Sequence, residues 1–192
     1  MELSGIHLGR RSAEALRELL AAAEQADLSY GHVGSTLRDG SVDGAGDRTF
    51  TIDAPGTLTV AAATLRAWAP HRGIRARILP EDAALAEGTT LLVVAPFGPL
   101  EMAVPDRVVA VVDEPTRFGF AYGTLTGHAE AGEEAFLAEQ VGPGRLRLTV
   151  RVQARPATLL ARLGTPVVTV LQKAAARRYL KAWAAAIEEA RA

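Results

Sequence analysis

Apolar and polar positions alternate most clearly in two stretches of the second half of the chain. From 117 to 124, aromatic residues and threonine alternate with glycine and alanine, and from 145 to 152, leucine and valine alternate with arginine and threonine. Successive side chains of a strand point to opposite faces, so each stretch predicts a strand with two unlike faces. The bare glycine face of the first strand indicates that another backbone, a ligand or a packed helix lies close to it.

Other periodicities predict the remaining elements. Apolar runs and period-two segments predict strands near residues 50–52, 74–79, 89–97, 108–112 and 133–140, with an irregular connection at 99–105. Apolar residues at helical spacing predict helices over about 12–26 and 57–68, a helical turn at 156–163, and one long helix from Thr165 to about Ala190. Trp68 falls on the apolar stripe of the second helix, which assigns it to the core.

The order of these elements predicts the fold class. Consecutive strands joined by short turns form an antiparallel sheet, and a long amphipathic helix must bury its apolar face against that sheet. This α+β order is similar to the helix-grip fold of the START-like superfamily, in which a curved antiparallel sheet of about seven strands wraps a long C-terminal helix. We expect residues 1–47 to form an extra N-terminal helix and a flexible loop packed on a helix-grip domain of residues 48–192.

Composition limits the partners and the cellular compartment that we expect. The chain of 192 residues has 21 basic and 22 acidic residues and no cysteine. The near balance of charge gives no bulk electrostatic reason to expect nucleic acid or an anionic membrane as a partner. Without cysteine there are no disulfides, which fits a reducing cytoplasm. No apolar run approaches the roughly 20 residues that span a bilayer, so we expect a cytoplasmic protein without membrane insertion.

The densest group of ionisable residues follows the glycine-striped strand. Three carboxylates, Glu130, Glu133 and Glu134, crowd His128, and such crowding can hold a histidine charged near neutral pH. A solvated acidic loop would have the same sequence. A metal site is disfavoured because His128 and Glu130 supply only two ligands, so we expect neither a metal nor a cofactor.

Arg178 is the second candidate position. On a helical wheel it lies at the centre of the stripe formed by Leu163, Val167, Leu171 and Ala174, whereas the later apolar residues lie on the opposite side. An arginine there either pairs with one of the three carboxylates inside the core or lays its stem on apolar surface with its head in water.

The residues themselves resemble a domain family catalogued without function, DUF1990. The resemblance covers most of the chain from Tyr30 onward, and its long third motif is specific. It rests on Tyr30-x-x-Val33-Gly34-x-Thr36, on Ala63-x-x-Arg66-x-Trp68-x-x-His71-Arg72, on Gly119-Phe120-Ala121-Tyr122-Gly123-Thr124-Leu125-x-Gly127-His128-x-Glu130-x-Gly132-Glu133-Glu134-x-Phe136, and on Arg178-Tyr179. No established activity comes with this family, so the resemblance implies a fold and a place to look.

Three hypotheses for function remain open. The first is that the domain binds a small hydrophobic or amphipathic molecule in a cavity between sheet and terminal helix, with polar contacts from Tyr122, His128, Glu130, Glu133, Arg155 and Arg178. The second is an enzyme, a hydrolase, cyclase or isomerase, in which His128 or Glu133 is a general base and Tyr122 stabilises an oxyanion. The third is a structural or interaction module, since the apolar runs at 91–95 and 108–112 need cover on both faces, from the N-terminal helix or from a second subunit of a homodimer.

Overall fold

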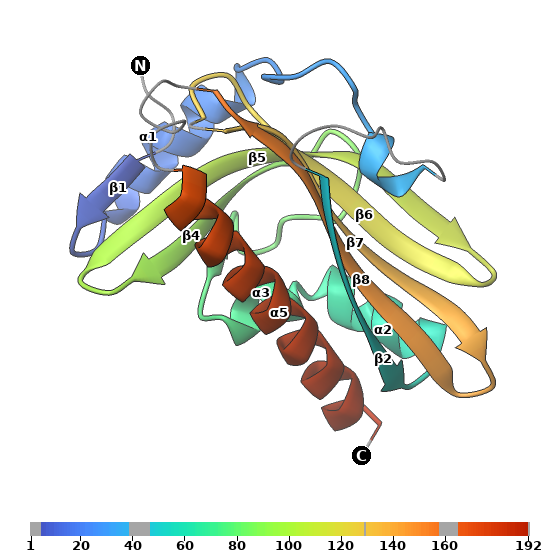
Figure 1. Cartoon of the computed structure of the whole chain (residues 1–192). Coiled ribbons are helices and arrows are strands. Elements are labelled where there is room, and N and C mark those ends of the chain that lie inside the picture. The colour runs from blue at the N-terminus through green and yellow to red at the C-terminus, as the bar shows by residue number, and fades with distance from the viewer. Residues whose placement is uncertain (1–4, 39–46, 129, 158–164, 192) are drawn as a thin grey trace.

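The strands form one curved antiparallel sheet in a computed structural model that describes residues 5–38, 47–128, 130–157 and 165–191 (Figure 1). The sheet order is β2-β8-β7-β6-β5-β4-β3, and β1 pairs with the start of β5. The strands are β1 (Gly5–Leu8), β2 (Asp47–Pro55), β3 (Arg77–Leu79), β4 (Thr90–Phe97), β5 (Leu100–Glu114), β6 (Arg117–Thr124), β7 (Glu130–Gly142) and β8 (Arg145–Pro156).

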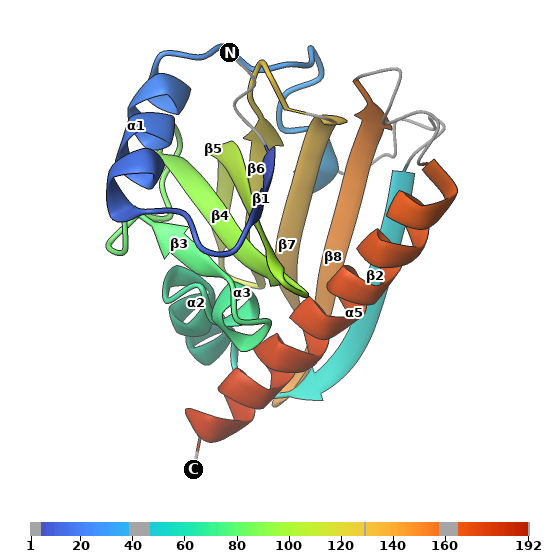
Figure 2. The same cartoon turned by 90° about the vertical axis from the view of Figure 1, so that its left-hand side faces the viewer.

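Three helices cover the inner, concave face of the sheet (Figure 2). They are the long α5 (Thr165–Glu189), α2 (Leu58–Arg66) and the short α3 (Ala69–Gly73). Within the described part of α5, the buried side chains include Leu180, Trp183 and Ile187, and they join the aromatic core of the sheet. The predicted α+β fold, with a curved sheet gripping a long C-terminal helix, is confirmed.

The N-terminal segment covers the outer face. Helix α1 (Ala13–Glu24), capped by the Ser12 hydroxyl, buries Leu16 against Leu92 and Val94 of β4. Further along, the 3-10 turn η1 (Ser35–Leu37) buries Leu37 against the outer side of β6 and β7. The apolar runs that needed cover on both faces therefore receive it from the same chain.

Some predicted boundaries were wrong. The segment at 99–105, predicted to be irregular, belongs to the continuous strand β5, and the loop expected up to Gly132 is already strand from Glu130. The strand predicted at 74–79 is only three residues long, and β1 was not predicted. The turn at 156–163 and the flexible loop before residue 48 lie almost entirely outside the described residues.

The predicted helix at 57–68 is two helices. Trp68 adopts a left-handed conformation, φ 56°, which ends α2 and starts α3. Its ring is 2% exposed and its Nε1 donates to the Ala83 carbonyl at 2.9 Å, so the assignment of Trp68 to the core is confirmed.

Candidate functional site

The inner face of the sheet is aromatic along most of its length and polar at one end. Phe118 and Phe120 of β6 are sealed from solvent, and the Phe120 ring stacks on Phe136 of β7 at 5.3 Å between centroids. Further along β6, Tyr122 pairs in register with Glu134, so both side chains share this inner face. The polar end therefore begins where the aromatic core stops.

Tyr122 is the centre of a buried hydrogen-bond network. Its hydroxyl donates to Glu134 Oε2 at 2.5 Å and lies 3.1 Å from His71 Nε2. The Tyr179 ring of α5 lies beside the same histidine, with 4.9 Å between the ring centroids. Because Tyr122 has only one proton to give, the consistent arrangement has His71 Nε2 donating to its oxygen while it donates to Glu134.

His71 is a neutral member of this network. It is fully buried among the rings of Tyr122, Phe136 and Tyr179, with centroids 4.9–5.8 Å away. Burial lowers its pKa to about 3, because a charged imidazolium would lose its hydration there. Its Nδ1 has no hydrogen-bond partner among the described residues, which agrees with the single ring proton being on Nε2.

The carboxyl groups at this end are held toward their protonated forms. Burial raises the pKa of Glu134 to about 7, against the opposing effect of the Tyr122 hydrogen bond, and Glu130 adds repulsion. Asp106 of β5 is 4% exposed, and burial, Glu134 and Glu130 raise its pKa well above the usual range. Glu134 keeps part of its surface exposed, so this end of the inner face reaches solvent.

Asp106 of β5 faces the same end of the inner face. Its register partner is Thr124, and it has the same parity along β5 as the inner-face residues Val104 and Val108. Its side chain is almost fully buried, and its carboxyl accepts no hydrogen bond from any residue that the structure describes. A buried carboxyl with a raised pKa is a candidate contact for a bound molecule.

Glu133 is on the other side of the sheet. Its register partner is Gly123, and its carboxylate, 3% exposed, accepts hydrogen bonds from the 30–36 segment on the outer face. The donors are Tyr30 Oη and Gly34 N to Oε2, both at 2.8 Å, and Ser35 Oγ, Thr36 N and Thr36 Oγ1 to Oε1 at 3.1, 2.6 and 2.9 Å. Five donors occupy the carboxylate, so its geometry fits an anchor for the N-terminal segment and argues against the predicted role as a general base.

His128 does not pair with a carboxylate side chain as predicted. Its Nδ1 lies 2.8 Å from both the backbone N and the backbone O of Glu130, so it bonds the main chain of that residue. Burial lowers the pKa of His128, whereas the prediction was a raised value. The reason is that the strand begins at Glu130 and alternates the three glutamates between faces.

The two candidate arginines are exposed. Arg155 lies near the end of β8, and Arg178 lies on the solvent side of α5 next to the buried Tyr179. The expectation that Arg178 pairs with a carboxylate inside the core is therefore wrong, and the alternative of a solvated head group fits. The stripe residues Leu163, Val167 and Leu171, on which that expectation depended, have no described side chains.

Sequence reasoning thus found Tyr122 and missed its partners. Of these, His71 and Tyr179 stood only in family motifs, and Glu134 was named only as one of three possible partners of His128. The inner-face position of Glu134 could have been read from its spacing to Phe136, two residues on. Asp106 gave no distinguishing signal.

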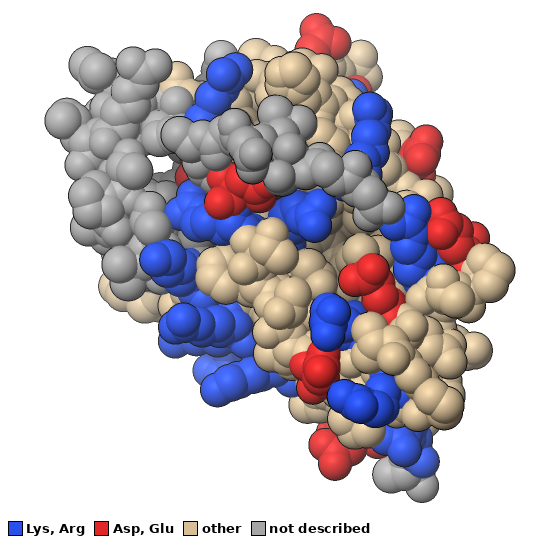
Figure 3. Space-filling model, turned by 45° about the vertical axis from the view of Figure 1, so that its right-hand side comes forward, with Lys and Arg blue, Asp and Glu red and all other residues tan. Residues whose placement is uncertain are grey.

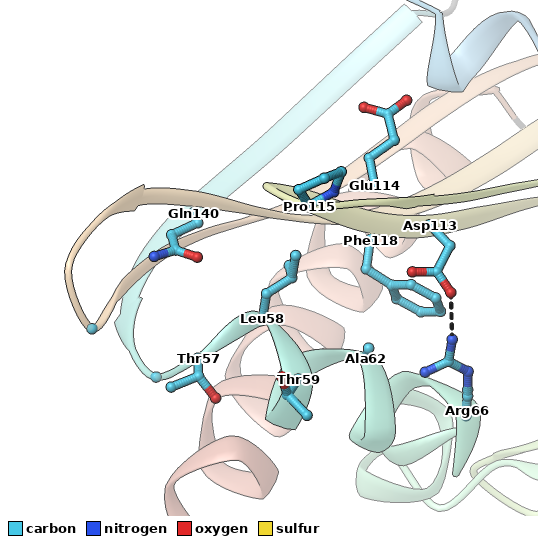
Figure 4. Close-up of a pocket in the computed structure, with 12 residues that line it drawn as sticks. Thr57, Leu58, Thr59, Ala62, Arg66, Asp113, Glu114, Pro115, Phe118 and Gln140 are labelled. Carbon is cyan, nitrogen blue, oxygen red and sulfur yellow. Dashed lines mark hydrogen bonds and ion pairs between the residues drawn. The ribbon is translucent and has the colours of Figure 1, made fainter.

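A groove of about 480 Å³ lies at the opposite end of the sheet, between the start of α2 and the β5–β6 turn (Figure 4). Arg66 crosses it, pairing with Asp113 at 2.8 Å and lying 4.3 Å from the Phe118 ring centroid. The charges of Arg66 and Asp113 are paired, the rim is largely polar, and no described residue of this groove has a buried polar atom without a partner. On β6 the groove lies at Phe118, near the start of the strand, whereas the Tyr122 network lies near its end.

Two other classes of site receive no support from the described residues. No group of three or more histidine and carboxylate residues there could hold a metal ion. No described helix is long and apolar enough to cross a membrane.

The comparisons with known proteins place this geometry in a family. A family model described as a domain of unknown function, DUF1990, matches residues 46–182. A UPF0548 protein of Deinococcus radiodurans is 38% identical over 100 residues, which are 48% of this chain and 50% of that protein. The matched stretch thus spans about half the length of that relative.

Solved structures share the fold at low identity. Norcoclaurine synthase of Thalictrum flavum superposes with a TM-score of 0.53 at 14% identity, over 79% of this chain and 100% of that one. Human STARD10 superposes with a TM-score of 0.51 at 10% identity, over 91% and 80% of the two chains. Such identities show the fold alone, and the predicted START-like fold is confirmed.

Proposed function

The chain belongs to the DUF1990 family of domains of unknown function, and we propose that it binds a small amphipathic molecule at the polar end of the inner sheet face. The polar group of the ligand lies at Tyr122, Glu134 and Asp106, and its apolar part lies between the sheet and α5. A START-like fold is compatible with this use. The solved norcoclaurine synthase, which shares the fold, is in complex with a transition-state analogue.

The observation that carries the proposal is the Asp106 carboxyl. It is 4% exposed, burial and two neighbouring carboxyls raise its pKa well above the usual range, and it accepts no hydrogen bond from a described residue. A ligand with a hydrogen-bonding group could bond this carboxyl, next to a partly exposed Glu134 that keeps the site reachable.

Binding can be tested with a fluorescent probe, N-phenyl-1-naphthylamine, whose N–H can donate to a carboxyl. We expect saturable binding to the full chain and at least about tenfold weaker binding to Asp106→Leu, which removes the acceptor for the single N–H of the probe. Asp113→Leu on the same strand is the matched control, because that exposed carboxylate pairs with Arg66 across the groove. Absence of saturable binding, or equal weakening by the control, would contradict the proposal.

A second candidate function is general acid–base catalysis by Glu134. A carboxyl with a pKa of about 7, hydrogen-bonded to a tyrosine hydroxyl, is suited to exchange protons near neutral pH. His128 and Glu133 are engaged elsewhere, so Glu134 takes the place that the sequence suggested for them.

The titration of Glu134 decides whether this candidate stands. Because its folded pKa lies above the unfolded value of 4.5, the contribution of Glu134 to stability is fully present below pH 4.5 and is lost as pH rises toward 7, by up to about 3 kcal/mol. Chemical denaturation across this range should show that slope as the difference in stability between the wild type and Glu134→Gln. A carbon NMR titration midpoint near 4.5 would remove the catalytic candidate and leave the binding proposal in place.

A further inference from the structure

The balanced charge of the whole chain hides a strong segregation along it. Residues 1–139 contain 20 of the 22 acidic residues, and the other two are Glu188 and Glu189. Between Gln140 and Ile187 there is no acidic residue and there are nine basic ones: Arg145, Arg147, Arg151, Arg155, Arg162, Lys173, Arg177, Arg178 and Lys181. Such an asymmetry indicates an anionic partner even though the net charge is −1.

The basic residues of β8 are partly engaged within the fold. Arg145 and Arg147 approach the carboxylate of Asp53 at 3.8 and 3.4 Å, and Arg151 donates to the Thr36 carbonyl at 3.0 Å. These contacts hold the edge strand β2 and the N-terminal segment against β8. The three β8 arginines therefore have partners within the fold, unlike the basic residues of the terminal helix.

On α5 the basic residues have no such partners. Lys173, Arg177 and Lys181 follow one another at four-residue spacing, with Arg178 beside them, and all four are exposed without an ion pair to a described residue. Figure 3 shows blue side chains along the left-hand edge of that view, over α5. Like charges four residues apart on a helix repel and lower its stability. This spacing of like charges on α5 therefore disfavours folding, so folding does not explain it.

Helix α3 adds to the same surface. Gly73 packs so closely on α5 that a Cβ there would lie 2.3 Å from the Ala182 Cβ. This contact brings the exposed Arg72 and Arg75 next to the turn of α5 that holds Arg178 and Lys181. We call these six side chains, from Arg72, Arg75, Lys173, Arg177, Arg178 and Lys181, the basic face.

We propose that the basic face docks the domain on an anionic lipid surface. Between the charges, the described part of α5 exposes alanine and offers no aromatic or amide side chain that would read a nucleic-acid base. Binding to a layer of anionic headgroups needs no base-specific side chain, because each lysine or arginine near the layer adds to the binding free energy through its charge alone. This surface is separate from the inner-face site and does not depend on the proposed function.

The docking is peripheral and sensitive to salt. The large apolar side chains that the described chain exposes, Leu8, Val33, Met102 and Val141, all lie outside α3 and α5, so the basic face has nothing large and apolar to insert. Without insertion, attraction falls off within a Debye length of about 8 Å at physiological salt. We expect adsorption at low ionic strength and release at about 0.5 M salt.

Sedimentation of the full chain with vesicles tests the proposal. Vesicles of phosphatidylcholine with about 30% phosphatidylserine should bind the protein, and pure phosphatidylcholine should not. The triple variant Lys173→Gln, Arg177→Gln, Lys181→Gln should bind about 100-fold more weakly, because each charge near the surface contributes roughly fivefold. Its melting temperature should be equal to or above that of the wild type, since repulsion is removed.

The control removes the same charge elsewhere. Arg10→Gln, Arg17→Gln, Arg145→Gln changes three exposed arginines away from the basic face and should retain binding. Equal binding to neutral vesicles, retention by the first triple variant, or equal loss in the control overturns the proposal. Stronger binding to a double-stranded DNA competitor than to the anionic vesicles also overturns it, in favour of nucleic acid.

Discussion

Replacement of Glu133 by glutamine tests how the N-terminal segment is held on the sheet. The carboxylate oxygens collect five donors from Tyr30, Gly34, Ser35 and Thr36. A glutamine oxygen can keep the donors on one side, but its amide nitrogen then faces Gly34 N–H, which cannot turn round to accept. The Tyr30 hydroxyl can rotate and accept, so one buried donor loses its partner.

The magnitude follows from these contacts. One unsatisfied buried N–H costs about 1–3 kcal/mol, and each hydrogen bond to a charged group contributes about 1.5–3 kcal/mol, more than a neutral one. Allowing for partial retention at the other oxygen, we expect Glu133→Gln to lower the free energy of unfolding by about 3–5 kcal/mol. If the segment detaches before the sheet unfolds, the loss is limited to its docking energy.

Two measurements separate these outcomes. Urea denaturation gives the global loss, and amide hydrogen exchange shows whether residues 30–38 lose protection on their own. Glu139→Gln is the matched control, since it lies on the same face of β7, half-buried, and its carboxylate has no hydrogen bond to a described residue. A loss below about 1 kcal/mol with unchanged exchange at 30–38 would show that the carboxylate is not the anchor.

Three further predictions follow from the placement of single side chains. In Gly123→Ala, the new Cβ would lie 2.1 Å from Tyr30 Oη, so the ring must leave; urea denaturation should show a loss of about 2 kcal/mol or more, reduced in a Tyr30→Ala background. Arg178→Met should change stability by less than about 0.5 kcal/mol, because the head group is exposed, and a loss near 3 kcal/mol would mean a buried pair. His128 should titrate by NMR below its unfolded pKa of 6.5, so its neutral form is favoured in the fold and stability falls as pH drops below 6.5; a higher midpoint would restore the carboxylate pairing.

The fold was predictable where periodicity and turns are strong. The alternation from 117 to 124 placed Phe118, Phe120 and Tyr122 on one face, and the structure has them together on the inner side. The start of β5 was missed because Pro99 and Pro105 suggest a broken segment, yet Pro105 falls at a position that pairs with Leu92 within the sheet. Likewise, β1 has no pattern that distinguishes it from a loose terminus.

The candidate site was less predictable, because it depends on register between strands. The sequence has three glutamates close to one histidine, but proximity in the chain is not proximity in space here. In the sheet, the period of two separates Glu133 from Glu134 completely. The histidine that reaches the inner network, His71, lies about 50 residues earlier, and only the packing of α3 brings it to Tyr122.

The adjacent residues Glu133 and Glu134 show how one strand can serve folding and function at once. On the outer face, Glu133 is saturated with donors from a segment about 100 residues away, and such a carboxylate has no capacity left for a ligand. On the inner face, Glu134 has one strong donor, retains exposed surface, and holds its proton near neutral pH. A shift of β7 by one residue in register would turn Glu134 to the outer face and Glu133 to the inner face. The carboxylate of Glu133 would then be buried in the aromatic core, away from the N-terminal segment. The outer anchor therefore fixes the register that presents Glu134 to the inner site, and a variant that weakens the anchor should also disturb binding there.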